Sequence, residues 1–364
     1  MRYLLAAAFA VAALPTLAAD FETDNGTVSL EALLMLDYRV YNDPGDLDQT
    51  RADGTIRRAR ATLEHELEDW SMQWQLDREA DGAIETSDAY IAYEGWKDLT
   101  LTAGRMKEPL GLENQTSSTD LPLTERSLAT EAFKTGRHIG LAVNYEDTPY
   151  TLSLGGFDIS EEDSDNEATP YAFTGRATWA PWQTLGQVLH LGAGYSHREW
   201  RGEMLNFDAE SGIYDTEDLL ETADFSVERQ ALGNLELGWM QGPFLIESEW
   251  YRSELTTSAG DRIAFDGGRV TASFWWGASL RHYDDGRFEL DTPAAGAWEL
   301  ALRYSTLDLS DADKDLNAAT IDLGLGYYVN AQTRLQLSTS RFESDEDGEK
   351  EEGYGAVGRI QYAF

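Results

Sequence analysis

The sequence predicts an all-β protein, a 16-stranded antiparallel transmembrane β-barrel with long external loops and an inward-folded third loop. Three observations indicate this fold. Apolar and polar residues alternate with a period of two along most of the chain, the connections alternate between long and short, and the chain ends on an aromatic residue, Phe364. Alternation with this period is typical of strands that have one apolar face.

The first residues have the three-part pattern of a secretory signal peptide. Met1 and Arg2 form a short basic start, residues 3–14 are apolar, and residues 16–19 offer small side chains at a cleavage point. An uncleaved membrane anchor is the alternative, but the apolar run is too short to span a bilayer comfortably. We therefore expect residues 1–19 to be a signal peptide and residues 20–364 to form an outer-membrane β-barrel.

Composition restricts the partners and the chemistry. A formal charge of −38 argues against nucleic acid, because phosphate contacts need Lys and Arg. An aromatic content of 11% and the regular alternation argue against a disordered chain. The absence of cysteine excludes disulfides, thiol catalysis and thiolate metal sites. After the signal peptide, no window approaches 18 consecutive apolar residues, so no transmembrane helix is predicted.

The alternating segments number about sixteen, and an even number is what a bacterial outer-membrane barrel requires. In residues 28–40, for example, the even positions are apolar and the odd positions are mixed. The segments are centred near residues 34, 61, 74, 90, 101, 142, 153, 176, 193, 235, 248, 273, 302, 324, 337 and 359. A soluble β protein can also have sixteen strands, so the count alone does not decide the fold.

The connections discriminate better, because an outer-membrane barrel has long loops outside and tight turns in the periplasm. The predicted long connections include residues 42–54, 105–137, 159–170, 200–226 and 343–353, and the short ones include residues 68–69, 94–98, 146–149, 240–243 and 330–333. One link, residues 283–295, is long where a short turn is expected.

The external loops also carry much of the acid, notably residues 159–170 and 343–353. A charged run is most simply a solvated loop. The functional alternatives are that these loops bind divalent cations that bridge lipopolysaccharide, or that they suit a saline habitat.

The last strand, residues 354–364, places Tyr354, Ile360, Tyr362 and Phe364 on one face, and Arg359 lies on the other. A terminal aromatic residue on a lipid-facing register is typical of the C-terminal strand that is handed to the barrel assembly machinery. Other aromatic residues share the lipid-facing parity, as expected of interfacial girdles: Trp70, Tyr145, Trp179, Tyr195, Trp250 and Trp276. Outer-membrane lipid and lipopolysaccharide are therefore predicted partners.

Several blocks of the sequence resemble the phosphate-selective porin O/P family of Gram-negative outer membranes. They are TIRRARATLEHELED at residues 55–69, AGRMKEPLGLENQTSSTDLPLTERS at 103–127, TGRHIGLAVNY at 135–145, GAWELALRYSTLDL at 296–309 and LGLGYYVNAQTRLQL at 323–337. The resemblance implies a sixteen-stranded barrel in the bacterial outer membrane, usually a homotrimer. It also implies a long third loop that folds inward and basic side chains that conduct anions.

Candidate pore residues are the Arg and Lys side chains that cluster in the sequence, because fixed cations of this kind replace the hydration of a permeating anion. Arg57, Arg58 and Arg60 lie in a stretch free of acids, and strand parity points Arg58 and Arg60 into the lumen. Parity also points Arg176 and Arg303 inward, where a salt bridge to a lumenal acid is the alternative role. Residues 105–137, the predicted constriction loop, contain five bases and five acids: Arg105, Lys107, Arg126, Lys134 and Arg137 against Glu108, Glu113, Asp120, Glu125 and Glu131.

Enzymatic function is not predicted. The five histidines are scattered without a recognisable metal-ligand spacing, and the chain has no GxSxG motif and no glycine-rich phosphate loop. We therefore expect no catalytic residues, no metal and no cofactor, although a phospholipase with Ser and His on adjacent strands is conceivable. The expected function is passive diffusion of small hydrophilic solutes with a preference for phosphate or similar anions. The alternatives are a nonspecific or cation-preferring pore, with Glu247, Glu249 and Glu299 in its lumen, and a structural or adhesive barrel with an occluded lumen.

Overall fold

The computed structural model describes residues 19–23, 26–43, 46–78, 82–160, 169–184, 186–277, 281–291, 294–311 and 314–364. Residues 1–18 of the predicted signal peptide and the acidic residues 161–168 lie outside this part of the chain, and Ala19 begins β1 (Ala19–Thr23). Among the described residues, no helix is both long enough and apolar enough to cross a membrane.

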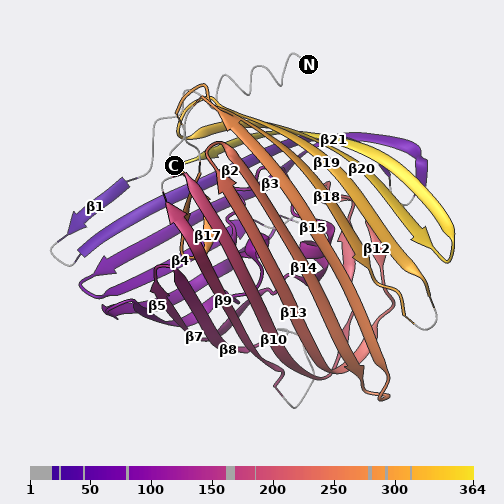
Figure 1. The fold of residues 1–364 in the computed structure, drawn as a ribbon, viewed down its shortest axis with the longest axis horizontal. Helices are drawn as coiled ribbons and strands as arrows, with labels where there is room; N and C mark the ends of the chain where they lie inside the picture. The colour runs from indigo at the N-terminus through magenta and orange to yellow at the C-terminus, as the bar shows by residue number, and fades with distance from the viewer. Residues whose placement is uncertain are drawn as a thin grey trace.

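Sixteen antiparallel strands slant around a closed barrel (Figure 1), and β1 pairs with β2 as a seventeenth strand of the same sheet. They are β2 (Gly26–Asp43), β3 (Asp46–Leu67), β4 (Trp70–Arg78), β5 (Ile84–Trp96), β6 (Leu99–Lys107), β7 (Arg137–Asp147), β8 (Tyr150–Asp158), β9 (Tyr171–Thr184), β10 (Gln187–Leu205), β13 (Phe225–Gln241), β14 (Phe244–Thr257), β15 (Arg262–Trp276), β18 (Trp298–Asp308), β19 (Leu316–Tyr328), β20 (Thr333–Glu346) and β21 (Glu349–Ala363). Each pairs with its neighbour along the chain, and β21 closes the barrel on β2, with Leu36 opposite Ile360. All sixteen predicted segments fall on these strands, so the predicted barrel is confirmed.

Alternating side chains face out of and into the barrel. On β18, Leu300, Leu302 and Tyr304 are 41–52% exposed, whereas the intervening Glu299 and Arg303 are buried. The six aromatic residues expected in girdles are all exposed, and a ring of Trp276 stacks on Trp298 with centroids 6.0 Å apart. The outer face is apolar because lipid tails offer no hydrogen-bond partners to polar side chains. The charged side chains lie in the interior.

The C-terminal strand departs from its predicted pattern at one residue. Tyr354 is exposed as expected, but Tyr362 is only 7% exposed and packs against Phe364, with ring centroids 5.6 Å apart. Phe364 itself is half-buried, and its backbone exchanges hydrogen bonds with Ala32 of β2 at 2.9 and 3.1 Å.

Two predicted long loops are instead mostly extended hairpins. Residues 343–353 lie in the projecting ends of β20 and β21, which are joined through Asp347 and Gly348. Residues 42–54 belong largely to β2 and β3. Alternating acids do not prevent strand formation there, since cross-strand pairs such as Arg341 with Glu352 offset part of the repulsion.

The remaining elements lie in three connections. Residues 108–136 contain the short helices α2 (Leu112–Gln115) and α3 (Leu128–Phe133), and α3 is capped by the Ser127 hydroxyl, which accepts from the Thr130 N–H. Residues 206–224 contain β11 (Asp208–Glu210) and β12 (Asp218–Glu221). Residues 281–290 form the hairpin β16 (Arg281–Asp284) and β17 (Arg287–Leu290), which explains why the link at 283–295 is longer than a tight turn.

Candidate functional site

The connection between β6 and β7, residues 108–136 and hereafter the third loop, is hydrogen-bonded to several distant strands. The Glu249 carboxylate of β14 accepts from the Leu112 and Glu113 N–H groups at 2.6 and 2.9 Å. Arg359 of β21 donates to the Thr124 carbonyl at 2.5 Å, and Arg334 of β20 donates to the Leu121 carbonyl at 2.9 Å. The third loop therefore contacts inward-facing polar residues well beyond the strands that it connects.

Glu113 and Glu125 of the third loop form ion pairs with arginines of the barrel wall. Glu113 lies 3.3 Å from Arg303 and 3.5 Å from Arg269. Burial disfavours the ionised form of Glu113, but these two guanidinium groups outweigh it and lower its pKa to about 2. The Glu125 carboxylate meets Arg57 at 2.7 Å and Arg359 at 2.6 Å, and the two arginines hold its pKa well below the usual range despite its burial.

A third loop acid, Glu108, is neutralised in the same way. Its carboxylate lies 2.8 Å from both Arg198 and His138 and accepts from the Thr174 hydroxyl at 2.5 Å. Burial again opposes its ionisation, and Arg198 and His138 lower its pKa below the usual value. Three of the five acids in the predicted constriction loop thus have their charge offset by the wall.

The nine sequence-predicted bases fall into two groups. Five form ion pairs with carboxylates: Arg57 with Glu125, Arg60 with Asp77, Lys134 with Glu131, Arg137 with Asp88, and Arg176 with Glu236. An arginine in a bidentate carboxylate pair, such as Arg60, has little residual charge to offer to a passing ion.

The other four predicted bases have neutral hydrogen-bond partners. Arg58 donates to the Ser118 hydroxyl at 2.8 Å, Lys107 to the Asn114 carbonyl at 2.7 Å, Arg126 to the Thr116 carbonyl at 2.8 Å, and Arg105 to the Thr86 carbonyl at 3.1 Å. Within the described part of the chain, none of the four has a carboxylate within ion-pair distance. No neighbouring carboxylate therefore offsets the charge of these four side chains.

Arg57 reaches the interior because of a β-bulge. Met35 of β2 pairs with Arg58 and the next residue, Leu36, pairs with Ile56, so Arg57 is the extra residue on β3. Strict alternation places Arg57 outside, whereas the bulge lets it contact Glu125 together with the ring of Tyr214, 3.8 Å from the guanidinium carbon.

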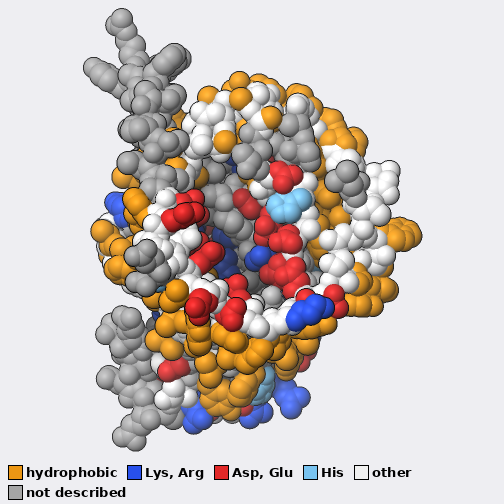
Figure 2. Space-filling view, turned by 90° about the vertical axis from the view of Figure 1, so that its left-hand side faces the viewer, with side chains coloured by type: hydrophobic (Ala, Val, Ile, Leu, Met, Phe, Trp, Pro, Cys, Tyr) orange, Lys and Arg blue, Asp and Glu red, His pale blue; other side chains and the backbone are white. Residues whose placement is uncertain are grey.

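Two cavities approach one another at Arg58 and Arg60. One, of about 270 Å³, is lined by Arg58 and by acids of the 206–224 connection such as Glu210. The other, of about 720 Å³, is lined by Arg60 and by Ser117 and Thr119 of the third loop. Arg58 and Arg60 are two residues apart on one strand, about 7 Å. Arg58 lines the smaller cavity, and its partner Ser118 stands between two residues that line the larger one. Figure 2 shows charged side chains gathered in a hollow surrounded by a hydrophobic outer surface.

The predicted residues are only partly brought together. Arg57, Arg58 and Lys134 line the smaller cavity and Arg60 the larger. Arg105, Lys107, Arg126, Arg137 and Arg176 line neither of these two cavities. Charged neighbours of Arg58 include Arg57, Arg60 and Arg126, and those of Lys107 include Arg126, Arg137 and Arg60, so most of the set forms one basic cluster. Arg176 instead holds the β16–β17 hairpin, donating to the Gly286 carbonyl at 2.8 Å.

Sequence reasoning missed most of the arginines that fix the third loop: Arg198, Arg269, Arg334 and Arg359 on the barrel strands, and Arg281 on β16. Inward strand parity is the signal that could have found them. The same wall neutralises the lumenal acids proposed for a cation pore, since Glu249 pairs with Arg269 at 2.6 Å and Glu299 pairs with both Arg281 and Arg334 at 2.9 Å. Arg303 has the salt-bridge role considered for it, with Asp322 at 2.9 Å.

The 206–224 connection lies against strands on the far side from β10 and β13, which it joins. The Ser211 carbonyl accepts from Ser340 of β20 at 3.1 Å, and the Asp215 carbonyl accepts from Arg39 of β2 at 3.0 Å. Burial, with Glu125 and Glu131 nearby, raises the pKa of Glu210 to about 8. Burial, with Asp208 nearby, raises the pKa of Asp218 to about 6.

Residues 28–364 match the family model described as phosphate-selective porin O and P. The chain belongs to this family. It is a porin of the bacterial outer membrane, a channel rather than an enzyme.

Known relatives are consistent with this family. Porin O of Pseudomonas aeruginosa is 28% identical over 324 residues, which cover 76% of this porin and 73% of that protein. An uncharacterized protein of Caulobacter vibrioides is 30% identical over 265 residues, 65% of this chain and 52% of the relative, so the chain spans about half of that relative's length.

Solved structures share the fold. An anion-selective porin from Comamonas acidovorans has a TM-score of 0.62 at 14% identity, covering 93% of this chain and 99% of that chain. A trimer form of OmpT from Vibrio cholerae has a TM-score of 0.57 at 13% identity, covering 94% and 100%. At these identities the likeness concerns the barrel itself.

Proposed function

We propose that this porin allows passive diffusion of small hydrophilic anions, phosphate or similar, and that Arg58 is the main selecting group, supported by Lys107 and Arg126. One observation carries the proposal. These cations donate to neutral partners, while Glu108, Glu113 and Glu125 of the third loop are paired with cations of the barrel wall. Arg58, Lys107 and Arg126 then offer charge that no carboxylate pair offsets, in a chain with a formal charge of −38.

The third loop serves as the constriction in this proposal. A narrow site must replace part of the hydration shell of a permeating ion, and fixed cations do so for anions. The planar fork of Arg58 suits two oxygens of a phosphate, and the Ser118 hydroxyl that it contacts is a further donor. Because the loop is tied to the wall through Glu113 and Glu125, its cations keep their positions as ions pass.

We also propose the membrane partners expected from the sequence. The exposed apolar face supports contact with outer-membrane lipid and lipopolysaccharide, and the terminal Phe364 supports delivery by the barrel assembly machinery. The trimer form of a structurally similar porin supports a homotrimer.

The proposal is tested by the reversal potential of the reconstituted porin in a KCl gradient. The wild type should show the sign of anion selectivity, and Arg58→Gln should move the potential toward zero. Arg252→Gln is the matched control, because Arg252 is exposed and pairs with Glu254 and Asp266 outside the lumen. A wild-type reversal potential with the sign of cation selectivity contradicts the anion preference. The absence of conductance contradicts both the anion-preferring pore and the nonspecific or cation-preferring pore.

A further inference from the structure

The β16–β17 hairpin has two faces of different character. Its buried face contains Arg281 and Phe288, and Arg281 donates to the Glu299 carboxylate of β18 at 2.9 Å and to the Asp120 carbonyl of the third loop at 2.6 Å. At the tip, Gly286 has a φ of 72° and lies against Thr151 and Thr178. A Cβ added at Gly286 would lie only 2.8–3.0 Å from atoms of these two threonines. The hairpin is thus held in one position by the wall and by the third loop.

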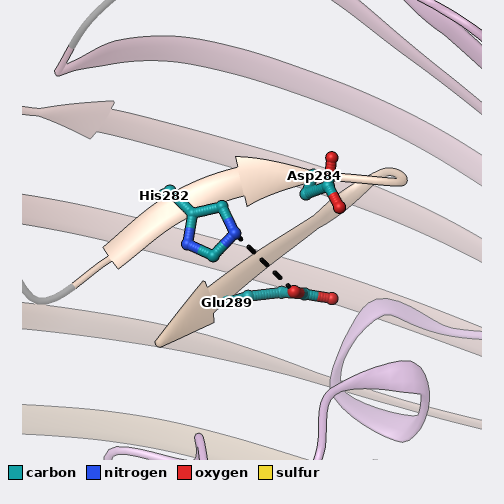
Figure 3. Close-up of side chains that lie close together, drawn as sticks. All are labelled: His282, Asp284 and Glu289. Carbon is teal, nitrogen blue, oxygen red and sulfur yellow. Dashed lines mark ion pairs between the residues drawn. The ribbon is translucent and has the colours of Figure 1, made fainter. Parts of the chain in front are cut away.

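The opposite face of the hairpin carries three potential metal ligands. His282 and Asp284 are two residues apart on β16, so they share a face, and His282 is directly opposite Glu289 of β17. One ligand atom from each side chain lies within 4.8 Å of the other two. Figure 3 shows the imidazole and the two carboxylates converging from the two strands of the hairpin.

Two groups in this cluster have no close partner within it. His282 Nδ1 lies 3.1 Å from the Asp291 carboxylate, whereas Nε2 faces Glu289 at 3.7 Å, which is beyond hydrogen-bond distance. Asp284 forms no ion pair with any residue in the described ranges. A ring nitrogen, Nε2, that faces carboxylate oxygens without hydrogen-bonding to them is an arrangement that a cation between them can complete.

We propose that His282, Asp284 and Glu289 form a binding site for a divalent transition-metal ion, with zinc as the best representative. An imidazole nitrogen combined with carboxylate oxygens suits Zn²⁺, whereas Ca²⁺ and Mg²⁺ take oxygen ligands alone. Ligands about 2.1 Å from a tetrahedral Zn²⁺ are about 3.4 Å from one another. Side-chain rotations bring a set already within 4.8 Å to that separation without moving the hairpin backbone.

Arg287 would compete with a bound cation for the Glu289 carboxylate. Its guanidinium lies 2.9 Å from one Glu289 oxygen and 3.3 Å from Asp285. A bound cation must share Glu289 with this positive charge or displace it. Removal of Arg287 should therefore tighten metal binding.

The test is calorimetric titration of Zn²⁺ into the metal-free, detergent-solubilised full chain at neutral pH, with bound metal counted by elemental analysis. We expect one ion per chain. His282→Gln and Asp284→Asn should each weaken binding by at least about tenfold, while Arg287→Gln should strengthen it several-fold. Binding should also weaken on acidification, because protons compete for the imidazole. An excess of Ca²⁺ should leave the zinc in place.

His197→Gln is the matched control. His197 has 36% of its side chain exposed, pairs with Glu199 at 3.1 Å and lies on β10, away from the hairpin. It should bind zinc as the wild type does. Heat-modified electrophoretic mobility verifies that each variant retains a folded barrel, as expected for the His282 side chain, which is 44% exposed. No binding by the wild type, equal binding by the His282 and Asp284 variants, or displacement by Ca²⁺ overturns the proposal.

Discussion

The substitution Glu113→Gln tests how strongly the wall holds the third loop. The pKa of Glu113 is lowered from 4.5 to about 2. This difference corresponds to about 3 kcal/mol of stabilisation at neutral pH. The geometry agrees with this magnitude, because the buried carboxylate lies near Arg269 and Arg303 and accepts from the Ser127 N–H and hydroxyl at 3.0 and 2.7 Å. Glutamine keeps the shape and an acceptor but removes the charge.

Hydrogen exchange of peptides from residues 108–136 measures this effect. A loss of about 3 kcal/mol should speed exchange through local opening by about a hundredfold, with the barrel strands unaffected. Because the folded pKa is depressed, the Glu113 contribution is complete above about pH 5 and is lost as the pH falls toward 2.

A neighbouring acid provides the control. Glu131→Gln removes a carboxylate that pairs only with the half-exposed Lys134, and such a pair is worth about 1 kcal/mol or less. It should leave the exchange of the loop nearly unchanged. If Glu113→Gln and Glu131→Gln behave alike, the ion pairs of Glu113 with the wall do not hold the loop, and the reasoning is wrong.

Two further predictions concern selectivity. Arg58→Gln should reduce the anion-to-cation permeability ratio more than Arg60→Gln, because Asp77 already neutralises Arg60; equal effects in bi-ionic potential measurements argue against charge pairing as the deciding factor. The ratio should also fall as the pH rises from 5 to 9, because Glu210 and Asp218, whose pKa values are raised to about 8 and 6, become negative beside the smaller cavity. Glu210→Gln should remove the upper part of that transition, and a ratio independent of pH contradicts it.

The strands could be predicted from the sequence because their signal is local. Alternation of side chains determines which face meets lipid, and each of the sixteen segments carries that signal within its own residues. Residues 42–54 and 343–353 were predicted as long connections between alternating segments, but they form mostly extended hairpins. Residues 343–353 show that an extended pair tolerates acids when both faces meet water.

The site depends on pairings that the local sequence does not encode. The bulge that turns Arg57 inward appears only in the register of β2 with β3. The ligand set of His282 and Glu289 appears only when residues 281–290 are known to be a hairpin, because the spacing along the chain matches no familiar metal motif. Cross-strand geometry, rather than composition, brings these groups together.

The charge around the third loop is another property that the local sequence does not determine. Five bases and five acids in the predicted constriction loop suggest no net field, and the formal charge of −38 suggests a cation path. The ion-pair and hydrogen-bond partners of these residues lead to a different expectation. Glu113 and Glu125 meet Arg303 and Arg359, which lie 190 and 234 positions later in the chain, while Arg58 donates to a hydroxyl. Because the Debye length at physiological ionic strength is about 8 Å, an ion in the proposed constriction should respond to unpaired charge nearby more than to the total charge of the chain.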